Sequence, residues 1–450
     1  MVEGKVAVLG LGYAGLSFTV AVASKGFRVI GVDVDQRKVK LITQGKAPFH
    51  ESGLEELLVK VLNNKLLKVT TKYRETLRES NIVFIFVGTP SRPDGSCDLK
   101  YVENASKMVG EVLRDKNDYQ LIVIRSTVPP GTTENFVKRI IEDFSGRVCG
   151  KDFGLCMNPE FMREGKALYD VFHPSMIVIG EYDRRSGSIL EKFYRRLHGD
   201  RLPPIIRTSI VNAELIKYAA NIFLALKVSF INFIARIAQR LSEADVTVIA
   251  KGIGLDPRIG EAFLGAGLGF GGSCLPKDLK AFIKFAEELD EDATLLKAIL
   301  DINDGQIDNA IYLLKKGLCR EDLRDVTVAV LGLAYKPGTD DIRESQSIKL
   351  VKKLVELGVN VKVHDPKALE GARKALRSMV RYCNDIYECI RDVEAIIIAT
   401  DWPECRKLDL DRAKNLVHTP LIVDRRRILI PEHARSKGFE YLGIGLSPEY

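Results

Sequence analysis

A six-residue segment that occurs twice is the feature that most constrains the fold. VAVLGL stands at 6–11 and again at 328–333, and each copy is followed by a second apolar stretch that ends in an aspartate, Asp33 or Asp365. The copies lie too far apart for a solenoid, whose repeats have a period of about 20 to 50 residues. The repeat therefore predicts two nucleotide-type α/β domains that flank a segment of another kind.

The pattern of apolar residues supports this division. In the first third of the chain, β-branched runs alternate with helix-like stretches, which is typical of a parallel sheet covered by helices on both faces. From about Val211 to Leu241, apolar residues recur at three and four positions without proline or glycine, which predicts one long helix and favours a dimer interface on it. We expect an α/β fold in which two Rossmann-like, doubly wound parallel-sheet domains are joined by a central all-helical region. The predicted boundaries are 1–200, 201–317 and 318–450.

Composition restricts the class of protein. The 450 residues are 46% hydrophobic and 28% charged, as in folded globular proteins. The net charge of +7 is spread along the chain, which suits a phosphorylated small molecule better than nucleic acid. The longest apolar runs, such as IVFIFVG at 82–88, are too short to span a bilayer, and we expect no signal peptide. We therefore expect a cytoplasmic protein that binds neither nucleic acid nor a membrane.

The first copy of the repeat contains a dinucleotide-binding pattern, GLGYAG at 10–15, between a predicted strand and a predicted helix. In this context Gly10 permits the tight turn, Gly12 lets the backbone approach a pyrophosphate, and Gly15 lets helix and strand pack closely. Asp33 ends the next strand and would bind the ribose hydroxyls. A carboxylate there would repel a 2′-phosphate, so the pattern predicts NAD rather than NADP.

The second copy reads VLGLAYKPGTDD and lacks the second and third glycines. A second dinucleotide is therefore not expected there. A simpler nucleotide would suit it, with Lys336 and Arg343 as partners for phosphate or carboxylate groups. Both side chains are equally compatible with ordinary surface charges. For the run Arg425, Arg426 and Arg427, charge alone favours a solvated face over a phosphate clamp.

Several polar residues have spacings that place them on one side of a helix. Glu214, Lys217 and Asn221 share one side of the long helix, and Glu160 and Glu164 would share a face if their segment is helical. A lysine on a largely apolar helix either extends its amine to solvent or is buried for a purpose. For Lys217 taken alone, the solvent-directed alternative is favoured.

Eight cysteines occur without any CxxC pair, which argues against a metal site or a disulfide framework. One of them, Cys274, stands in GFGGSCLPKD among three glycines, with Lys277 and Asp278 close behind. Backbone amides, a nearby cation and a helix N-terminus all lower the pKa of a thiol, and Pro276 suits a first helical turn. From these residues alone, a reactive thiolate and a small buried hydrophobe both stay open.

Taken together, the motifs resemble those of the UDP-glucose/GDP-mannose dehydrogenase family over nearly the whole chain. The matching segments follow the order of the family: GLGYAG, VGTPSRPDGSCDLKYV, STVPPGTT, NPEFMREG, NAELIKYAANIFLALK, GFGGSCLPKD and AYKPGTDDIRES. The resemblance implies an N-terminal NAD-binding domain, a central dimerisation domain with the catalytic loop, and a C-terminal domain that binds the nucleotide sugar.

The resemblance also implies the reaction. Members of the family oxidise the C6 alcohol of a nucleotide sugar to a carboxylate with two NAD, through a thioester on a cysteine that Cys274 matches. It implies that Lys217 and Asn221 stabilise oxyanions, that Asp278 and Thr127 position water, and that Glu160 assists thioester hydrolysis. UDP-glucose is the expected substrate and GDP-mannose the alternative. With UDP-glucose the product would be UDP-glucuronate, a precursor for polysaccharide biosynthesis.

The binding residues follow from the same resemblance. The positions expected to contact NAD are Gly10, Gly12, Tyr13, Ala14, Gly15, Asp33, Lys38, Thr89, Thr127, Glu164, Lys277 and Arg343. The positions expected to contact the nucleotide sugar are Glu160, Phe161, Glu164, Lys217, Asn221, Arg258, Phe263, Gly271, Lys336 and Arg426. Arg258 matches an arginine that reaches into the site of a neighbouring subunit. The family commonly has Asp-Gly-Arg near the C-terminus where this chain has Asp424-Arg425-Arg426, so Arg426 is the best match for the arginine.

Overall fold

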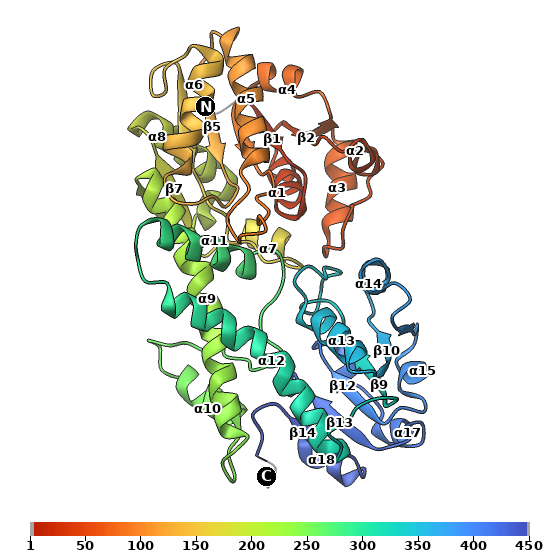
Figure 1. Cartoon of the computed structure of the whole chain (residues 1–450). Coiled ribbons are helices and arrows are strands. Elements are labelled where there is room, and N and C mark those ends of the chain that lie inside the picture. Colours follow the sequence, from red (N-terminus) through yellow and green to blue (C-terminus); the bar gives the residue numbers. More distant parts are fainter. Residues whose placement is uncertain (1–3, 448–450) are drawn as a thin grey trace. The chain divides into compact units, whose positions relative to one another are not determined.

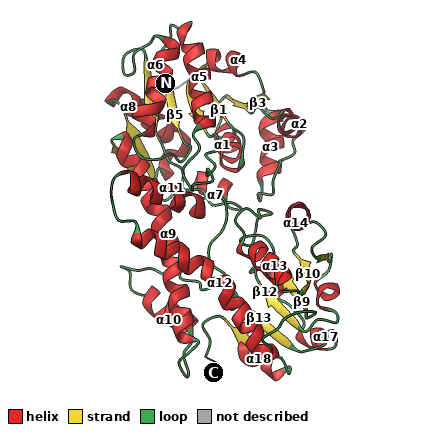
Figure 2. Cartoon of the chain, in the orientation of Figure 1, coloured by secondary structure: helices red, strands yellow, loops and turns green. Residues whose placement is uncertain are grey.

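The computed structural model describes residues 4–447, which form two compact units. The first contains residues up to 220 together with 280–285, and the second contains 221–279 and the residues from 286 onwards. Figure 1 follows the chain through its elements, and Figure 2 separates helices from strands. The three predicted domain boundaries stay predictions.

The first unit is built on an eight-stranded sheet with the order β3-β2-β1-β4-β5-β6-β7-β8. Its first six strands have the order 3-2-1-4-5-6 of a Rossmann fold, and only β6 and β7 pair antiparallel. The strands are β1 (Lys5–Leu9), β2 (Val29–Val32), β3 (Leu67–Thr70), β4 (Ser80–Ile85), β5 (Gln120–Ile124), β6 (Phe153–Met157), β7 (Ile177–Glu181) and β8 (Ile205–Thr208).

Both faces of this sheet are buried. Val6 and Val8 of β1 belong to one apolar cluster, whereas Ala7 and Leu9 belong to another, because successive side chains of a strand point to opposite faces.

The helices of the unit are α1 (Tyr13–Ser24), α2 (Gln36–Thr43), α3 (Leu54–Asn63), α4 (Tyr73–Glu79), α5 (Lys100–Arg114), the π-helix η1 (Thr133–Val137), α6 (Lys138–Ser145), α7 (Ala167–Phe172), α8 (Arg184–His198) and the short η2 (Gly199–Arg201).

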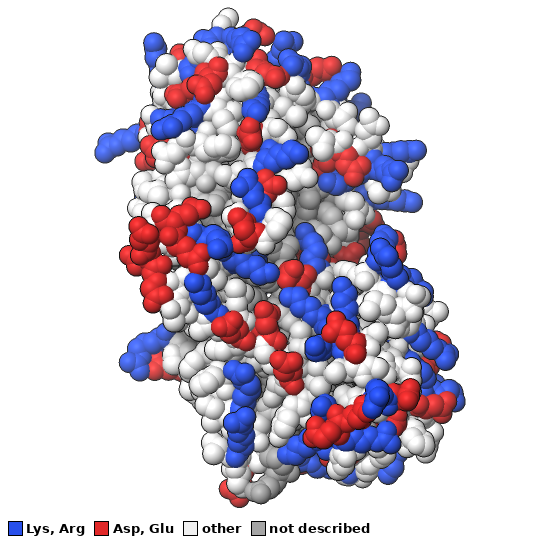
Figure 3. Space-filling model, viewed as in Figure 1, with Lys and Arg blue, Asp and Glu red and all other residues white. Residues whose placement is uncertain are grey.

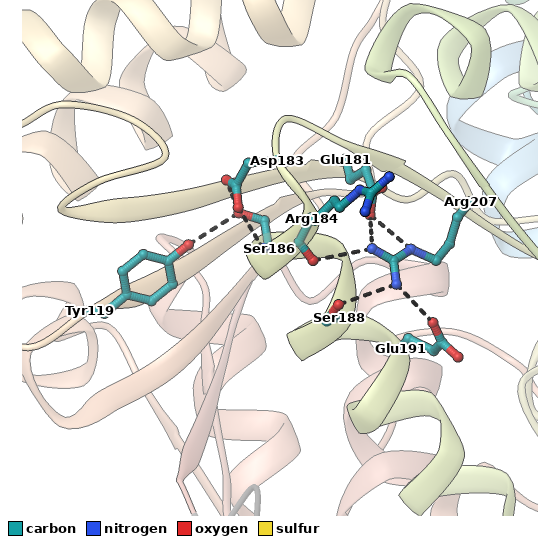
Figure 4. A network of polar contacts seen from close by, with 8 residues as sticks. All are labelled: Tyr119, Glu181, Asp183, Arg184, Ser186, Ser188, Glu191 and Arg207. Atoms are coloured by element: carbon teal, nitrogen blue, oxygen red, sulfur yellow. Dashed lines mark hydrogen bonds and ion pairs between the residues drawn. The ribbon is translucent and has the colours of Figure 1, made fainter.

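A polar network holds the edge strand β8 to its neighbours (Figure 4). The Arg207 guanidinium on β8 donates to Glu181 at the end of β7, to Glu191 and Ser188 of α8, and to a backbone carbonyl oxygen. One arginine therefore ties three elements together, and its fork geometry suits several acceptors at once.

The second unit contains a six-stranded, fully parallel sheet with the order β11-β10-β9-β12-β13-β14. Counted from β9, this is again 3-2-1-4-5-6, so the repeated sequence segment marks a repeated topology. The strands are β9 (Thr327–Leu331), β10 (Asn360–His364), β11 (Arg381–Tyr382), β12 (Ala395–Ile398), β13 (Leu421–Asp424) and β14 (Glu440–Gly443). The predicted fold class is confirmed.

The long predicted helix is α9 (Ile210–Ala238), and the division between the units falls within it. Within residues 4–447, α9 is the one helix that is long and apolar enough to cross a membrane. In its most apolar stretch 39% of the residues are buried. The core helices of soluble proteins can have the same length and hydropathy. The remaining helices are α10 (Val246–Gly254), α11 (Leu275–Glu288), α12 (Thr294–Leu318), α13 (Gln346–Glu356), α14 (Leu369–Leu376), α15 (Ile386–Ile390), α16 (Pro403–Arg406), α17 (Leu410–Lys414) and α18 (Pro431–Ser436).

Charged side chains of both signs are interspersed over the face drawn in Figure 3. This distribution agrees with the small net charge of the chain. No single basic tract dominates that face.

Candidate active site

The glycine loop joins β1 to α1 and leaves room for an anion. Gly10 has a φ of +93°, and a Cβ at this position would lie 2.6 Å from the carbonyl oxygen of Phe86. A Cβ at Gly15 would lie 2.0 Å from the Gly10 carbonyl oxygen, so the helix can approach the strand only because both are glycines. Gly12 is different: it is exposed, and no atom lies within 4 Å of the position of its Cβ.

The first turn of α1 completes this anion site. Gly12 is the N-cap of α1 and has no side chain with which to cap the first turn of the helix. A helix N-terminus carries a partial positive charge, which favours a bound phosphate. The residues of the chain therefore fit the pyrophosphate of a dinucleotide.

Asp33 at the end of β2 is held beside the loop. It is buried, and its Oδ2 accepts hydrogen bonds from the Leu11 N–H at 2.9 Å and from Lys38 Nζ at 2.7 Å. Burial alone would raise the pKa of Asp33, but the hydrogen bonds from Lys38, Asp35 and Leu11 outweigh burial and lower it. Asp33 is therefore a carboxylate, as the recognition of ribose hydroxyls requires.

Thr89 and Thr127 follow the carboxyl ends of β4 and β5, and β4 lies next to β1 in the sheet. Thr89 Oγ1 donates to the Thr127 carbonyl oxygen at 2.9 Å, which brings together two residues predicted from separate motifs. Ligands of open α/β sheets bind at this edge. The geometry agrees with the predicted contacts to NAD and does not test them.

Glu160, Phe161 and Glu164 follow β6 in a loop, so the predicted helical face for the two glutamates does not form. Glu160 instead binds Lys217 of α9: the distance from Nζ to Oε1 is 3.4 Å. The Lys217 ammonium also lies 5.2 Å from the centre of the Phe161 ring. Lys217 is only 5% exposed in its side chain, so the solvent-directed alternative favoured from the sequence is wrong.

Glu214 has a structural role that the sequence did not reveal. Its two carboxylate oxygens accept hydrogen bonds from the N–H groups of Gly131 and Thr133, at 2.6 and 2.8 Å. Burial raises the pKa of Glu214 to about 7, although both hydrogen bonds lower it. The glutamate therefore braces the STVPPGTT loop that carries Thr127. Its only signal in the sequence was a charge on an apolar helix, one turn before Lys217.

Cys274 lies in the second unit as the N-cap of α11, with Pro276 in the first turn, as predicted. The cysteine is exposed, so it is not a buried hydrophobe. Other cysteines differ: Cys149, Cys156 and Cys405 are buried, and burial raises their pKa, to about 12 for Cys149 and Cys405. Exposure at a helix N-terminus is the environment in which a thiol reacts.

Asp278 lies one turn after Cys274 and is fixed on both sides. Its N–H donates to the Cys274 carbonyl oxygen at 2.8 Å, and its Oδ2 accepts a hydrogen bond from Asn221 Nδ2 at 2.6 Å. Lys277 Nζ contacts the other carboxylate oxygen. Asp278 is 1% exposed, so this pairing compensates for the burial of its charge.

The loop before Cys274 is packed against α12 and against the segment that joins β9 to α13. Phe270 exchanges two hydrogen bonds with the Asn303 carboxamide, from the Phe270 N–H at 2.7 Å and to its carbonyl oxygen at 3.2 Å. A Cβ at Gly271 would lie 2.4 Å from the Glu344 carbonyl oxygen. These contacts explain the glycines of the motif by close packing. The predicted contact of Gly271 with substrate stays a prediction.

Arg343 and Lys336 follow β9. The Arg343 carbonyl oxygen accepts a hydrogen bond from the Gly272 N–H at 3.0 Å, and its guanidinium pairs with Asp341 at 2.7 Å. Lys336 Nζ lies 5.4 Å from the centre of the Tyr335 ring. The Arg343 backbone is thus bound to the loop that precedes Cys274, and the roles of Arg343 and Lys336 toward phosphate groups stay predictions.

The three consecutive arginines do not form a solvated face, and that prediction is wrong. Arg425 is fully buried, and its Nη1 donates to Asn309 of α12 at 2.7 Å. Arg427 pairs with Asp245 at 2.7 Å, with both side chains less than 10% exposed. Arg426 donates only its Nε, to a carbonyl oxygen at the end of β12. Because Arg425 and Arg427 are bound to the protein, Arg426 is the better candidate for the substrate.

Arg258 and Phe263 lie in the connection between α10 and α11. The Arg258 side chain is 87% exposed and pairs with Asp256 at 2.6 Å. Phe263 is 39% exposed, with a φ of +68°. No group of three or more metal-ligating side chains occurs within residues 4–447.

Comparisons with known proteins cover nearly the whole chain. Three family models match it: the NAD binding domain of the UDP-glucose/GDP-mannose dehydrogenase family at 4–198, the central domain at 211–305 and the UDP binding domain at 329–431. UDP-glucose 6-dehydrogenase TuaD of Bacillus subtilis is 39% identical over 443 residues, covering 98% of this chain and 93% of that protein. UDP-glucose 6-dehydrogenase AglM of Haloferax volcanii is 39% identical over 97% of this chain and 99% of that protein.

A solved structure has the same fold. The UDP-glucose dehydrogenase of the hyperthermophilic archaeon Pyrobaculum islandicum aligns with a TM-score of 0.91 at 42% identity, covering 98% of each chain.

Proposed function

Because the chain belongs to the UDP-glucose/GDP-mannose dehydrogenase family, an NAD-dependent oxidoreductase family, we propose that it oxidises UDP-glucose to UDP-glucuronate through a thioester on Cys274. The substrate follows from relatives named UDP-glucose 6-dehydrogenase at 38–39% identity and from the UDP binding domain model. The observation that carries the mechanism is the position of Cys274, exposed at the start of α11 with Asp278 one turn away.

The proposed reaction has two oxidations. When bound, NAD accepts a hydride from C6 in each of them. After the first, the Cys274 thiolate attacks the aldehyde carbon and forms a thiohemiacetal. Loss of the second hydride and a proton leaves a thioester. Water then cleaves the C–S bond, releasing the carboxylate and restoring the thiol.

The polar residues have distinct roles in this proposal. Lys217 and Asn221 stabilise the negative charge that develops on the oxygen at C6. Asp278, which Asn221 holds by its hydrogen bond, exchanges protons with the hydrolytic water, and Thr127 helps to position that water. Glu160, the partner of Lys217, is the base that assists hydrolysis.

We also propose that the protein acts as a homodimer through α9. Several apolar side chains on this helix and just after it are strongly exposed: Phe223 (60%), Phe230 (46%), Phe233 (44%), Ile237 (42%) and Leu241 (54%). Contiguous exposed apolar surface marks an interaction site. Arg258, whose side chain extends into solvent, would then contribute to the substrate site of the other subunit.

The stoichiometry of the reaction tests the proposal. With excess NAD and limiting UDP-glucose, two NADH per UDP-glucose are expected, and Cys274→Ala should form no acid. One NADH would mean a simple two-electron dehydrogenase that does not need the cysteine. GDP-mannose run in parallel is the alternative substrate: two NADH with it and none with UDP-glucose would keep the mechanism and overturn the substrate.

A further inference from the structure

A pocket in the second unit shares no lining residue with the candidate active site. It has a volume of about 270 Å³. Its walls are the C-terminal end of α9 with the two residues that follow, one face of α12, and β14 with the segment after it. The proposed oxidation therefore gives this pocket no task.

The charges that line the pocket are mainly positive. Arg236 comes from the last turn of α9, Arg240 from just after that helix and Lys316 from α12, against the single carboxylate of Asp308. Within residues 4–447, none of these three basic side chains makes a salt bridge or a hydrogen bond of its own. The Arg236 guanidinium lies close to α12, since its Nη1 is 3.5 Å from the position that a Cβ at Gly305 would occupy.

Gln239 provides a second and independent observation. It lines the pocket between the two arginines, and both its Nε2 and its Oε1 are buried without a hydrogen-bond partner. Buried side-chain amides are almost always hydrogen-bonded, so Gln239 would gain by turning its amide toward a partner in the pocket. That partner must accept one hydrogen bond and donate another.

We propose that this pocket binds a small sugar phosphate. Two arginines and a lysine match a phosphate, because the planar guanidinium donates paired hydrogen bonds to its oxygens. Gln239 and Asp308 match hydroxyl groups, which donate and accept. The volume lies below the roughly 300 to 1,000 Å³ of pockets that hold drug-sized ligands, which suits a ligand smaller than a dinucleotide or a nucleotide sugar.

Equilibrium binding of glucose 1-phosphate to the whole protein tests this site. Titration calorimetry is carried out with saturating UDP and NAD, so that the phosphate sites for the nucleotide sugar and for the cofactor are both filled. One glucose 1-phosphate should bind per chain, and the variants Arg236→Gln and Arg240→Gln should each weaken binding at least tenfold. Arg391→Gln removes the same charge from an exposed position of the second unit and should leave the affinity unchanged.

Two further arms make the result decisive. Gln239→Leu should weaken glucose 1-phosphate more than inorganic phosphate, because only the sugar can satisfy the carboxamide through its hydroxyls. No binding in the presence of UDP and NAD, or equal affinity in wild type and in the double variant Arg236→Gln/Arg240→Gln, would overturn the proposal. The comparison of variants does not depend on UDP or NAD, so it separates this site from the active site even if the proposed substrate is wrong.

Discussion

Glu214 should make the stability of the STVPPGTT loop depend on pH. Its carboxyl group is buried and accepts two backbone hydrogen bonds, and burial raises its pKa from 4.5 to about 7. In the unfolded chain the pKa is ordinary, so between pH 4.5 and 7 only the folded state keeps the proton. Stability from this group is therefore complete below pH 4.5 and is lost as pH rises toward and through 7.

The size of the effect follows from the shift in pKa. At about 1.4 kcal/mol per pKa unit, the free energy involved is roughly 3 kcal/mol. The variant Glu214→Gln cannot ionise and lacks this dependence. Relative to wild type, it should gain roughly 3 kcal/mol between pH 4.5 and pH 8.

Hydrogen exchange at the Gly131 and Thr133 amides is the appropriate assay, because both donate to Glu214 and a chain of two units need not unfold in a single step. Exchange is compared at pH 5 and pH 8 after correction for its intrinsic pH dependence. Asp143→Asn is the control, since it removes an exposed carboxylate from α6 of the same unit and should change little. A difference between wild type and Glu214→Gln that is equal at both pH values would refute the reasoning, because Glu214 would then stay ionised throughout.

Three further predictions concern the site and its support. Gly12→Ala should fold with an unchanged thermal midpoint but raise the KM for NAD at least tenfold, since no protein atom lies within 4 Å of the added carbon; an unchanged KM would show that the space is not for the cofactor. Asn221→Ala removes the 2.6 Å hydrogen bond to buried Asp278. Steady-state kinetics should therefore show kcat reduced about a hundredfold with little change in KM. An unaltered kcat would contradict the role of this pair. Arg425→Met leaves the Asn309 carboxamide oxygen without its donor and should destabilise the second unit by about 1 to 3 kcal/mol, measured as a lower thermal midpoint, whereas an unchanged midpoint would contradict that accounting.

The fold could be predicted from sequence because its determinants are local. Runs of β-branched residues mark strands that are buried on both faces, and the absence of proline and glycine marks α9. The glycine loop was predictable for the same reason: the requirement at Gly10 is set by its own φ and by one neighbouring strand.

Burial of charged residues could not be predicted, because it depends on partners that are distant in sequence. Lys217 is buried because Glu160, 57 positions earlier, supplies its counter-charge. Arg427 is buried because Asp245 lies 182 positions away in sequence, and Arg425 because α12 offers acceptors. A charge taken alone favours solvent, so reasoning from sequence errs wherever the fold brings a partner to it.

The two sheets show how the same topology can keep or lose a cofactor site. Asp33 and Asp365 end equivalent strands, and each accepts a hydrogen bond from the N–H of the leucine in its VAVLGL segment, Leu11 or Leu333. The two aspartates differ in their other partners. The Asp365 oxygen that accepts from Leu333 also accepts hydrogen bonds from the Ala334 N–H at 2.9 Å and from Trp402 Nε1 at 3.0 Å.

The loops differ in the same sense. Ala334 stands where the first copy has Gly12, and its N–H is bound to Asp365 rather than turned toward an exposed space. The other oxygen of Asp365 accepts from the N–H groups of Lys367 and Ala368. A carboxylate with five donors from its own chain has no capacity left for ribose hydroxyls. The second sheet therefore retains the aspartate as a brace for its loop, and any nucleotide it binds must be recognised by other residues.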